Sequence, residues 1–142
     1  MSKSFWYRWA WFYDLAEWTN RRAYTAAATR AAELVPVGAK VLDCAAGTGA
    51  FSLAAAKRAG SVLCTDQSEA MLDRARRKAA KMGLNNIGFA GRDITALPDP
   101  DGAFDAVIAA NVLHQSRCRR TAGYTRAQSS VSTMDLGFYR GR

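Results

Sequence analysis

Residues 41–56 read VLDCAAGTGAFSLAAA, and this stretch decides the fold. An apolar run ends at Asp43, a turn of small residues follows, and an alanine-rich segment continues the chain. An apolar run without alternation is typical of a strand covered on both faces, and the alanine-rich segment is typical of a helix. Gly47 and Gly49 permit backbone conformations that other residues avoid, and they let a ligand come close to the main chain. The stretch therefore predicts a strand, a turn open to a ligand, and a helix.

The alternation of helices and strands continues on both sides of this stretch. Ser68 can cap a helix that ends at Gly83, and its predicted apolar face is Met71, Leu72, Ala75, Ala79 and Met82. The predicted elements are helix 4–18, helix 20–35, strand 40–46, helix 48–60, strand 61–66, helix 68–84, strand 86–91, loop 94–102 and strand 104–111. Strands that alternate with helices predict an α/β fold with a parallel sheet.

Carboxylates follow three of these strands. Asp43 ends the first strand, Asp66 ends the second, and Asp93 follows the third. In an open parallel sheet, ligands bind beyond the carboxyl ends of the strands, where a carboxylate can accept hydrogen bonds from ribose hydroxyls. Asp93 could accept a hydrogen bond from an exocyclic amine. The turn alone is a weak signal that also fits a strand-to-helix connection without a ligand, because it lacks the third glycine of a dinucleotide fingerprint and the Gly-Lys-Ser/Thr ending of a P-loop.

Composition limits the class of protein. A chain of 142 residues with 49% hydrophobic residues allows one domain with a real core. Residues 1–114 carry 14 Lys and Arg against 11 Asp and Glu, whereas residues 115–142 carry 6 against 1. Since most of the basic excess lies outside the predicted domain, we do not expect nucleic acid to be the main partner.

The cysteines and the single histidine argue against metal chemistry and disulfides. Cys44, Cys64 and Cys118 are scattered without a CxxC pair, and His114 is the only histidine. Buried thiols in a reducing compartment are the simpler interpretation. The start of the chain is too aromatic for a secretory leader and too short to span a bilayer. We therefore expect a cytoplasmic protein without a metal ion.

The three acidic positions and the glycine turn together resemble the class I S-adenosylmethionine-dependent methyltransferases. VLDCAAGTG resembles their first motif, VLCTDQSEAMLDRARRKA their second region, GRDITALP their third and FDAVIAANVLH their fourth, over roughly residues 33–114. The chain looks closest to the small-molecule group that includes the ubiquinone/menaquinone C-methyltransferases. The resemblance implies a Rossmann-like, doubly wound parallel sheet, here incomplete, with strand order 3-2-1-4. It also implies S-adenosyl-L-methionine as the cofactor.

The resemblance also implies a role for each matching residue. Asp43, Ala45 and Gly47 would surround the methionine part of the cofactor, and Gly49 would fix the turn. Asp66 would hold the ribose hydroxyls. The remaining positions would lie near the adenine or the methionine amine: Gln67, Met71, Asp93 and Ile94 for the adenine, and Asn111 for the amine. Many members of the family have glycine where this chain has Ala45.

The expected activity is in-line methyl transfer to a small, apolar acceptor. Because a sulfonium methyl is already activated, alignment and exclusion of water can suffice. His114 is the one candidate general base, although a histidine in a connecting segment is the simpler interpretation. Two alternatives remain open: an inactive, truncated fragment that still binds S-adenosylmethionine, and an NAD-dependent oxidoreductase.

We expect three parts in the chain. Residues 1–36 would form a helical cap, residues 37–114 the cofactor-binding core, and residues 115–142 a poorly structured basic tail. Trp6 and Trp11 of the aromatic N-terminus could contact a substrate or a membrane surface, although packing over the sheet is the simpler interpretation. The family's sheet usually has seven strands and only four are predicted, so we expect a C-terminally truncated or frame-shifted chain whose last strand leaves an uncovered edge.

Overall fold

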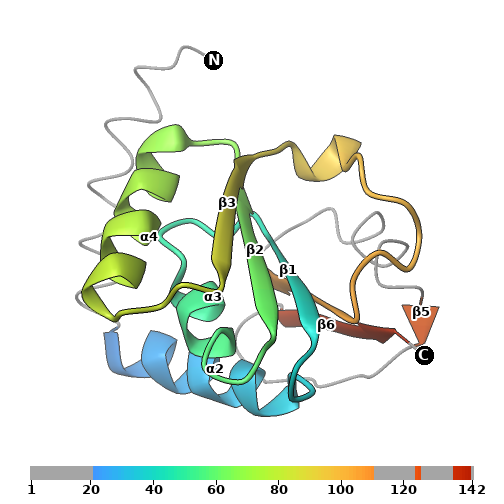
Figure 1. Cartoon of the computed structure of the whole chain (residues 1–142), viewed down its shortest axis with the longest axis horizontal. Helices are drawn as coiled ribbons and strands as arrows, with labels where there is room; N and C mark the ends of the chain where they lie inside the picture. The colour runs from blue at the N-terminus through green and yellow to red at the C-terminus, as the bar shows by residue number, and fades with distance from the viewer. Residues whose placement is uncertain (1–20, 111–123, 126–135, 142) are drawn as a thin grey trace.

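The computed structural model describes residues 21–110, 124–125 and 136–141 (Figure 1). Its sheet has the strand order β3-β2-β1-β4-β6-β5. Four neighbouring strands run parallel: β1 Lys40–Cys44, β2 Ser61–Asp66, β3 Ile87–Gly91 and β4 Ala106–Ala110. The predicted α/β class and the order 3-2-1-4 are thus confirmed.

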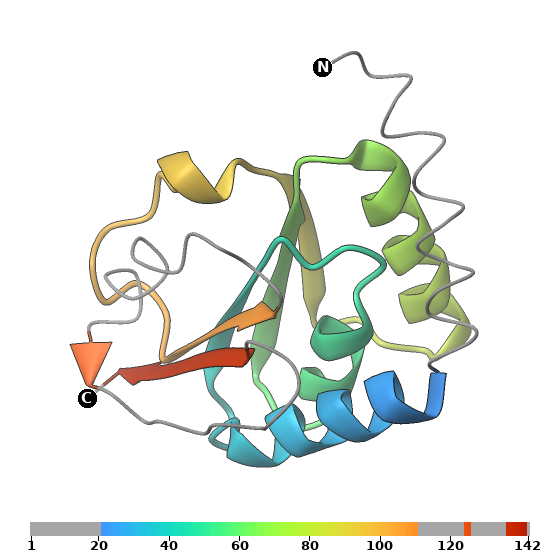
Figure 2. The same cartoon turned by 180° about the vertical axis from the view of Figure 1, so that it is seen from behind.

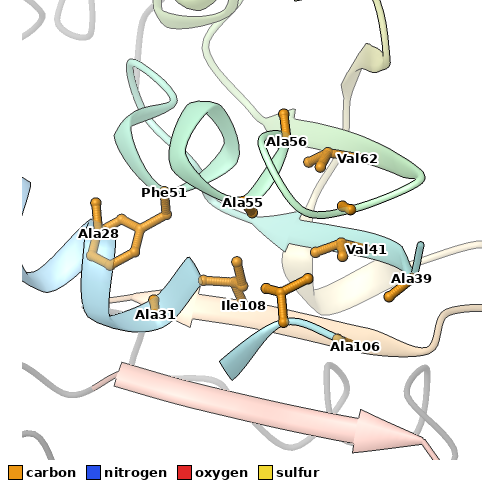
Figure 3. Packing of buried hydrophobic residues seen from close by; sticks show 12 residues of the cluster. Ala28, Ala31, Ala39, Val41, Phe51, Ala55, Ala56, Val62, Ala106 and Ile108 are labelled. Atoms are coloured by element: carbon orange, nitrogen blue, oxygen red, sulfur yellow. The ribbon is translucent and has the colours of Figure 1, made fainter. Parts of the chain in front are cut away.

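Three helices cover one face of this sheet: α2 Arg21–Leu34, α3 Ala50–Ala55 and α4 Glu69–Lys81. Small side chains let α2 and α3 pack closely, and Figure 3 shows Ala28, Phe51 and Ala55 meeting Val41 and Ile108 of the sheet. Since burial of apolar surface contributes about 25 cal/mol per Å², the packing of this layer stabilises the fold.

The opposite face of the sheet is covered by the segment around η1 Ile94–Ala96. Ile94 and Leu97 pack against a buried cluster that includes Leu42 and Val107. Figures 1 and 2 show η1 on the other side of the sheet from α4. An ion pair between the partly buried Arg92 and Asp99 joins the two ends of this segment. The predicted loop over 94–102 therefore contains one short helical turn and holds the second face of the core.

The helix α4 begins and ends where its capping residues predict. The Ser68 hydroxyl accepts a hydrogen bond from the Met71 N–H at 3.4 Å, and Gly83 takes a left-handed φ of +67° just beyond the last turn. The predicted apolar face is buried except at its end. Met82 is 47% exposed, because it is already the C-cap residue and no longer points along the helix face.

The expectations for the tail and for the edge of the sheet are wrong where the structure describes residues 115–142. β6 Leu136–Gly141 pairs antiparallel with β4, with Ala106 opposite Arg140, and β5 Tyr124–Thr125 pairs with β6. An edge strand presents unpaired N–H and C=O groups, which any extended segment within reach can satisfy. β4 is therefore an interior strand in this chain.

Several predictions lie outside the described residues: the helix over 4–18 with Trp6 and Trp11, and the residues Asn111, His114 and Cys118. In the part of the chain that the structure describes, no helix combines the length and the apolar character needed to cross a membrane. The described cysteines, Cys44 and Cys64, are both buried thiols.

Candidate functional site at the ends of β1 and β2

The turn after β1 is built from residues in left-handed backbone conformations. Ala45, Gly47 and Gly49 have φ values of +51°, +59° and +83°. The Ala46 N–H donates to the Thr65 carbonyl at 2.8 Å, and this hydrogen bond ties the turn to the end of β2. The left-handed region favours glycine, so Ala45 is strained there in a way that the two glycines are not.

The two glycines of the turn have different surroundings. A Cβ added to Gly49 would lie 2.9 Å from the Ala75 Cβ, so this glycine is needed for the close approach of α4 to the start of α3. A Cβ added to Gly47 would meet no heavy atom within 4 Å. Gly47 is therefore the glycine that leaves its backbone open to a ligand. On the α4 side, the turn is held by the Lys78 ammonium, which donates to the Thr48 hydroxyl at 3.1 Å.

Asp66, at the end of β2, connects the turn to α4. One of its carboxylate oxygens accepts a hydrogen bond from the Gly47 N–H at 2.9 Å, and the other accepts one from the Ser68 N–H at 2.8 Å. Both bonds fix the orientation of the carboxylate before any ligand arrives. A carboxylate has roughly four lone-pair positions, so two positions remain for further donors.

Asp43, at the end of β1, is almost completely buried, with 1% of its surface exposed. Its carboxyl accepts a hydrogen bond from the Ser52 hydroxyl at 2.6 Å, and the Thr65 hydroxyl donates to its main-chain carbonyl at 2.8 Å. Burial raises the pKa of Asp43 from 3.8 to about 7; the donors of Ser52 lower the pKa and the charge of Asp66 raises it further. A buried carboxyl with a pKa near neutrality is typical of functional sites.

The residues expected near an adenine lie along the same edge of the sheet. Asp93 is exposed and caps η1, where one of its oxygens accepts from the Thr95 N–H at 2.8 Å. Gln67 is exposed directly after β2. The side chains of Met71 and Ile94 are turned into the two sides of the core. Any contact of Ile94 with a ligand would therefore come from its backbone.

The sequence did not single out Ser52 or Thr65, which hold the Asp43 carboxyl and carbonyl. The signal that could have found Ser52 is its polar side chain within an otherwise alanine-rich helix start, nine residues after the carboxyl it meets. Among the described residues, no group of three or more His, Cys, Asp and Glu side chains could hold a metal ion.

Comparison with known proteins identifies the type of domain. Residues 41–131 match the family model of a methyltransferase domain. A demethylmenaquinone methyltransferase of Clavibacter sepedonicus is 43% identical over 89 residues, which cover 62% of this chain and 35% of that protein. An uncharacterised protein of Mycobacterium tuberculosis is 42% identical over 73 residues, covering 51% of this chain and 26% of that protein. The chain thus spans only a part of the length of these relatives.

A solved structure shows the same arrangement. A protein of Methanococcus maripaludis assigned as an S-adenosyl-L-methionine-dependent methyltransferase superposes with a TM-score of 0.60 at 25% identity, over 70% of this chain and 48% of that one. The order of the strands and helices therefore matches that of a known methyltransferase fold.

Proposed function

Because the chain belongs to the methyltransferase domain family, we propose that it binds S-adenosyl-L-methionine at the carboxyl ends of β1 and β2 and transfers the methyl group to a small, apolar acceptor. The observation that carries the proposal is the Asp66 carboxylate, which is held by the Gly47 and Ser68 N–H groups beside an open glycine turn. The name of the Clavibacter relative supports a small-molecule acceptor.

The described residues fit this cofactor. Asp66 retains acceptor positions for the two ribose hydroxyls, and the backbone at Gly47 is open to the methionine part. Asp43 supplies an acidic group behind the turn, and Asp93 supplies one near the expected adenine. Ala45 replaces a glycine at the cost of a strained φ, but its side chain is exposed and does not fill the core.

Methyl transfer from this cofactor requires mainly that the protein position the cofactor and the acceptor. When bound, S-adenosyl-L-methionine supplies a sulfonium methyl that is already activated for transfer. The chain's own residues hold the nucleoside through Asp66 and the turn, and they must exclude water and align the acceptor. The roles given to Asn111 near the methionine amine and to His114 as a base stay predictions. We also keep a cytoplasmic location as part of the proposal, since buried thiols such as those of Cys44 and Cys64 suit a reducing compartment.

The alternative of an NAD-dependent oxidoreductase finds no support in the relatives described above, and the turn lacks a third glycine. The alternative of an inactive binding fragment differs from the proposal only in turnover. Methylation of a panel of small acceptors by the purified chain separates these two, because a binding fragment would leave every acceptor unchanged.

Calorimetry with S-adenosylhomocysteine tests the binding site. Asp66→Ala should weaken binding by about 1–3 kcal/mol, the usual scale for hydrogen bonds to a charged group. Asp105→Ala is the matched control: Asp105 also accepts a backbone N–H, from Lys40 at 2.8 Å, but at the opposite end of β1. Equal binding by wild type and Asp66→Ala removes the role of Asp66, and absence of binding by wild type removes the proposed function.

A further inference from the structure

The charged residues of α4 divide between two flanks of the helix, on either side of the face that is buried on the sheet. Side chains three and four positions apart share a flank of a helix. One flank carries only cations, which are Arg74, Arg77, Lys78 and Lys81. The other flank carries Glu69 and Asp73, and Arg76 forms an ion pair with each of them at 2.7 Å. The acidic residues of α4 are therefore paired on the flank away from its other cations.

The surroundings of α4 fix the direction of each flank. The Lys78 ammonium donates to the Thr48 hydroxyl at 3.1 Å, so the cationic flank lies on the side of the glycine turn. The Arg76 guanidinium lies 5.4 Å from the centre of the Phe89 ring, so the other flank lies on the side of β3, at the edge of the sheet. The cations of the first flank are thus directed away from that edge, and Arg77 among them is exposed.

The start of α2 adds two further cations. Figures 1 and 2 both show the first turn of α2 beside the last turn of α4. Arg21 and Arg22 are exposed there, and the sequence of α2 has no acidic residue before Glu33. We define the basic face as the cations that α2 and α4 bring together, which are Arg21, Arg22, Arg74, Arg77 and Lys81.

Neither helix stability nor the proposed cofactor site accounts for the basic face. A cation in the last turn of a helix interacts favourably with the helix dipole, which explains Lys81 but not Arg74 or the cations of α2. Arg77 and Lys81 are four residues apart, and like charges at that spacing destabilise a helix. The cofactor site is built from Asp66 and the glycine turn and uses none of these residues. An anionic partner would remove the repulsion within the basic face.

Two apolar features beside the basic face favour a lipid surface as this partner. Met82 follows Lys81 directly and is 47% exposed. Residues 5–13, which lie outside the described residues, contain seven Phe, Trp and Tyr side chains. The chain from Tyr13 to Arg21 can span at most roughly 30 Å, so these aromatic residues stay near the start of α2. Aromatic side chains suit the interface of a bilayer, and clustered cations are attracted to its anionic headgroups.

We propose that the basic face docks the protein on an anionic phospholipid surface, with the headgroups facing its arginines and Lys81. The docking does not depend on the proposed function, because no residue of the basic face belongs to the cofactor site. A bilayer also dissolves apolar molecules, so docking would bring the protein next to a source of apolar acceptors.

Sedimentation with vesicles tests the proposal. Wild type should bind phosphatidylcholine vesicles that contain about one third phosphatidylserine about tenfold more tightly than vesicles of phosphatidylcholine alone. The preference should disappear at about 0.5 M salt, because ions screen the charges. The double variant Arg77→Gln, Lys81→Gln should bind the anionic vesicles about tenfold more weakly than wild type.

The matched control is the double variant Lys40→Gln, Lys57→Gln. It removes the same charge from exposed positions outside the basic face, at the start of β1 and directly after α3. The control should bind the anionic vesicles as wild type does. Thermal unfolding of both double variants should match wild type, because all four side chains are exposed.

Three results would overturn the proposal. The first is equal binding of both kinds of vesicle by wild type, and the second is an equal loss in the two double variants, which would show an effect of net charge alone. The third is tighter binding to polyuridylate than to anionic vesicles at the same phosphate concentration, which would make a nucleic acid the partner. Since vesicle binding is measured without a cofactor, each of these results leaves the test of S-adenosylhomocysteine binding untouched.

Discussion

Ala45 shows how one methyl group changes the backbone energy of this site. Its φ of +51° lies in the left-handed region, which costs an L-residue roughly 1–2 kcal/mol. Ala45→Gly should therefore raise the free energy of unfolding by about 0.5–1 kcal/mol, after allowing for the extra freedom that glycine gives the unfolded chain. Chemical denaturation measures the change.

The neighbouring alanine is the control for this prediction. Ala46 is partly buried against the cluster of Cys64, Leu72 and Ala75 and has no positive φ. Ala46→Gly should lower the free energy of unfolding by about 1 kcal/mol, because it gains no relief from strain and loses packing. The interpretation of Ala45 as a strained residue is wrong if both glycine variants are destabilised equally.

Asp43 makes stability depend on pH in an unusual direction. The folded protein holds this proton up to about pH 7, whereas the unfolded chain loses it near the ordinary pKa of 3.8. Since the folded state binds more protons in that interval, the free energy of unfolding falls as pH rises from about 4 to about 7 and then levels off. Asp43→Asn does not titrate and should lack this fall, which is on the order of 2–4 kcal/mol.

Urea denaturation at about pH 5 and about pH 8 measures this difference. Asp43→Asn should gain stability relative to wild type at the higher pH. Thr65→Val serves as the control, since it loses a hydrogen bond to the Asp43 main chain but leaves the carboxyl in place. If the pH dependence of Asp43→Asn is parallel to that of wild type, the carboxyl is not the titrating group.

At the scale of elements, the approach of α3 to α4 depends on a single glycine. Gly49→Ala places a Cβ 2.9 Å from that of Ala75 and keeps a left-handed φ of +83°, so strain and overpacking add. We expect a loss of about 2–4 kcal/mol in the free energy of unfolding. Gly47→Ala, where the added Cβ meets nothing within 4 Å, should lose only about 1–2 kcal/mol.

Ligand affinity should rank Gly47→Ala and Gly49→Ala in the opposite order: Gly47→Ala, the less destabilised variant, should lose more affinity. Gly47 leaves its backbone open where a ligand would approach, so Gly47→Ala should reduce the affinity for S-adenosylhomocysteine more than its modest loss of stability indicates. Calorimetry on Gly47→Ala and thermal unfolding of both variants provide the comparison. Equal loss of stability in the two variants would contradict the assignment of Gly49 to helix packing.

The elements predicted most accurately are those that local signals define. β2 occupies residues 61–66 as predicted, because an apolar run lies between Gly60 and a cap at Ser68. The antiparallel β6 was missed, because the tail has no period of its own and its pairing with β4 joins residues far apart in the chain. Met82 was placed on the buried face because periodicity cannot tell where a helix axis ends.

In the site, too, the features that local sequence defines could be predicted, and those that depend on distant contacts could not. The strand-end positions of Asp43 and Asp66 and the glycine turn could be predicted, because chain order alone fixes which end of a parallel strand they occupy. The partners of these carboxylates could not, because the sequence does not say that Asp66 holds the Gly47 N–H or that Ser52 meets Asp43. Those contacts depend on how α3 and α4 pack, which side-chain volumes such as those of Gly49 and Ala75 decide.

At the scale of the whole molecule, β6 decides how β4 behaves. β4 is buried from Ala106 to Ala109 and pairs with β6 on the side away from β1. Deleting residues 136–142 leaves that side without its strand partner. Unpaired strand edges pair with other chains, so the deletion variant should self-associate as its concentration rises, whereas the full chain should do so less. Light scattering after size-exclusion chromatography measures the mass.

A charge on the exposed strand tests the cause of that association. Ala110 ends β4 opposite Leu136 and is only partly buried, so a lysine at this position can be tolerated at the edge. Ala110→Lys in the deletion variant should restore a smaller mass, because a charge on an edge strand opposes pairing with another chain. If the deletion variant stays at the mass of the full chain at every concentration, or if Ala110→Lys leaves the association unchanged, the β4 edge is not what β6 protects.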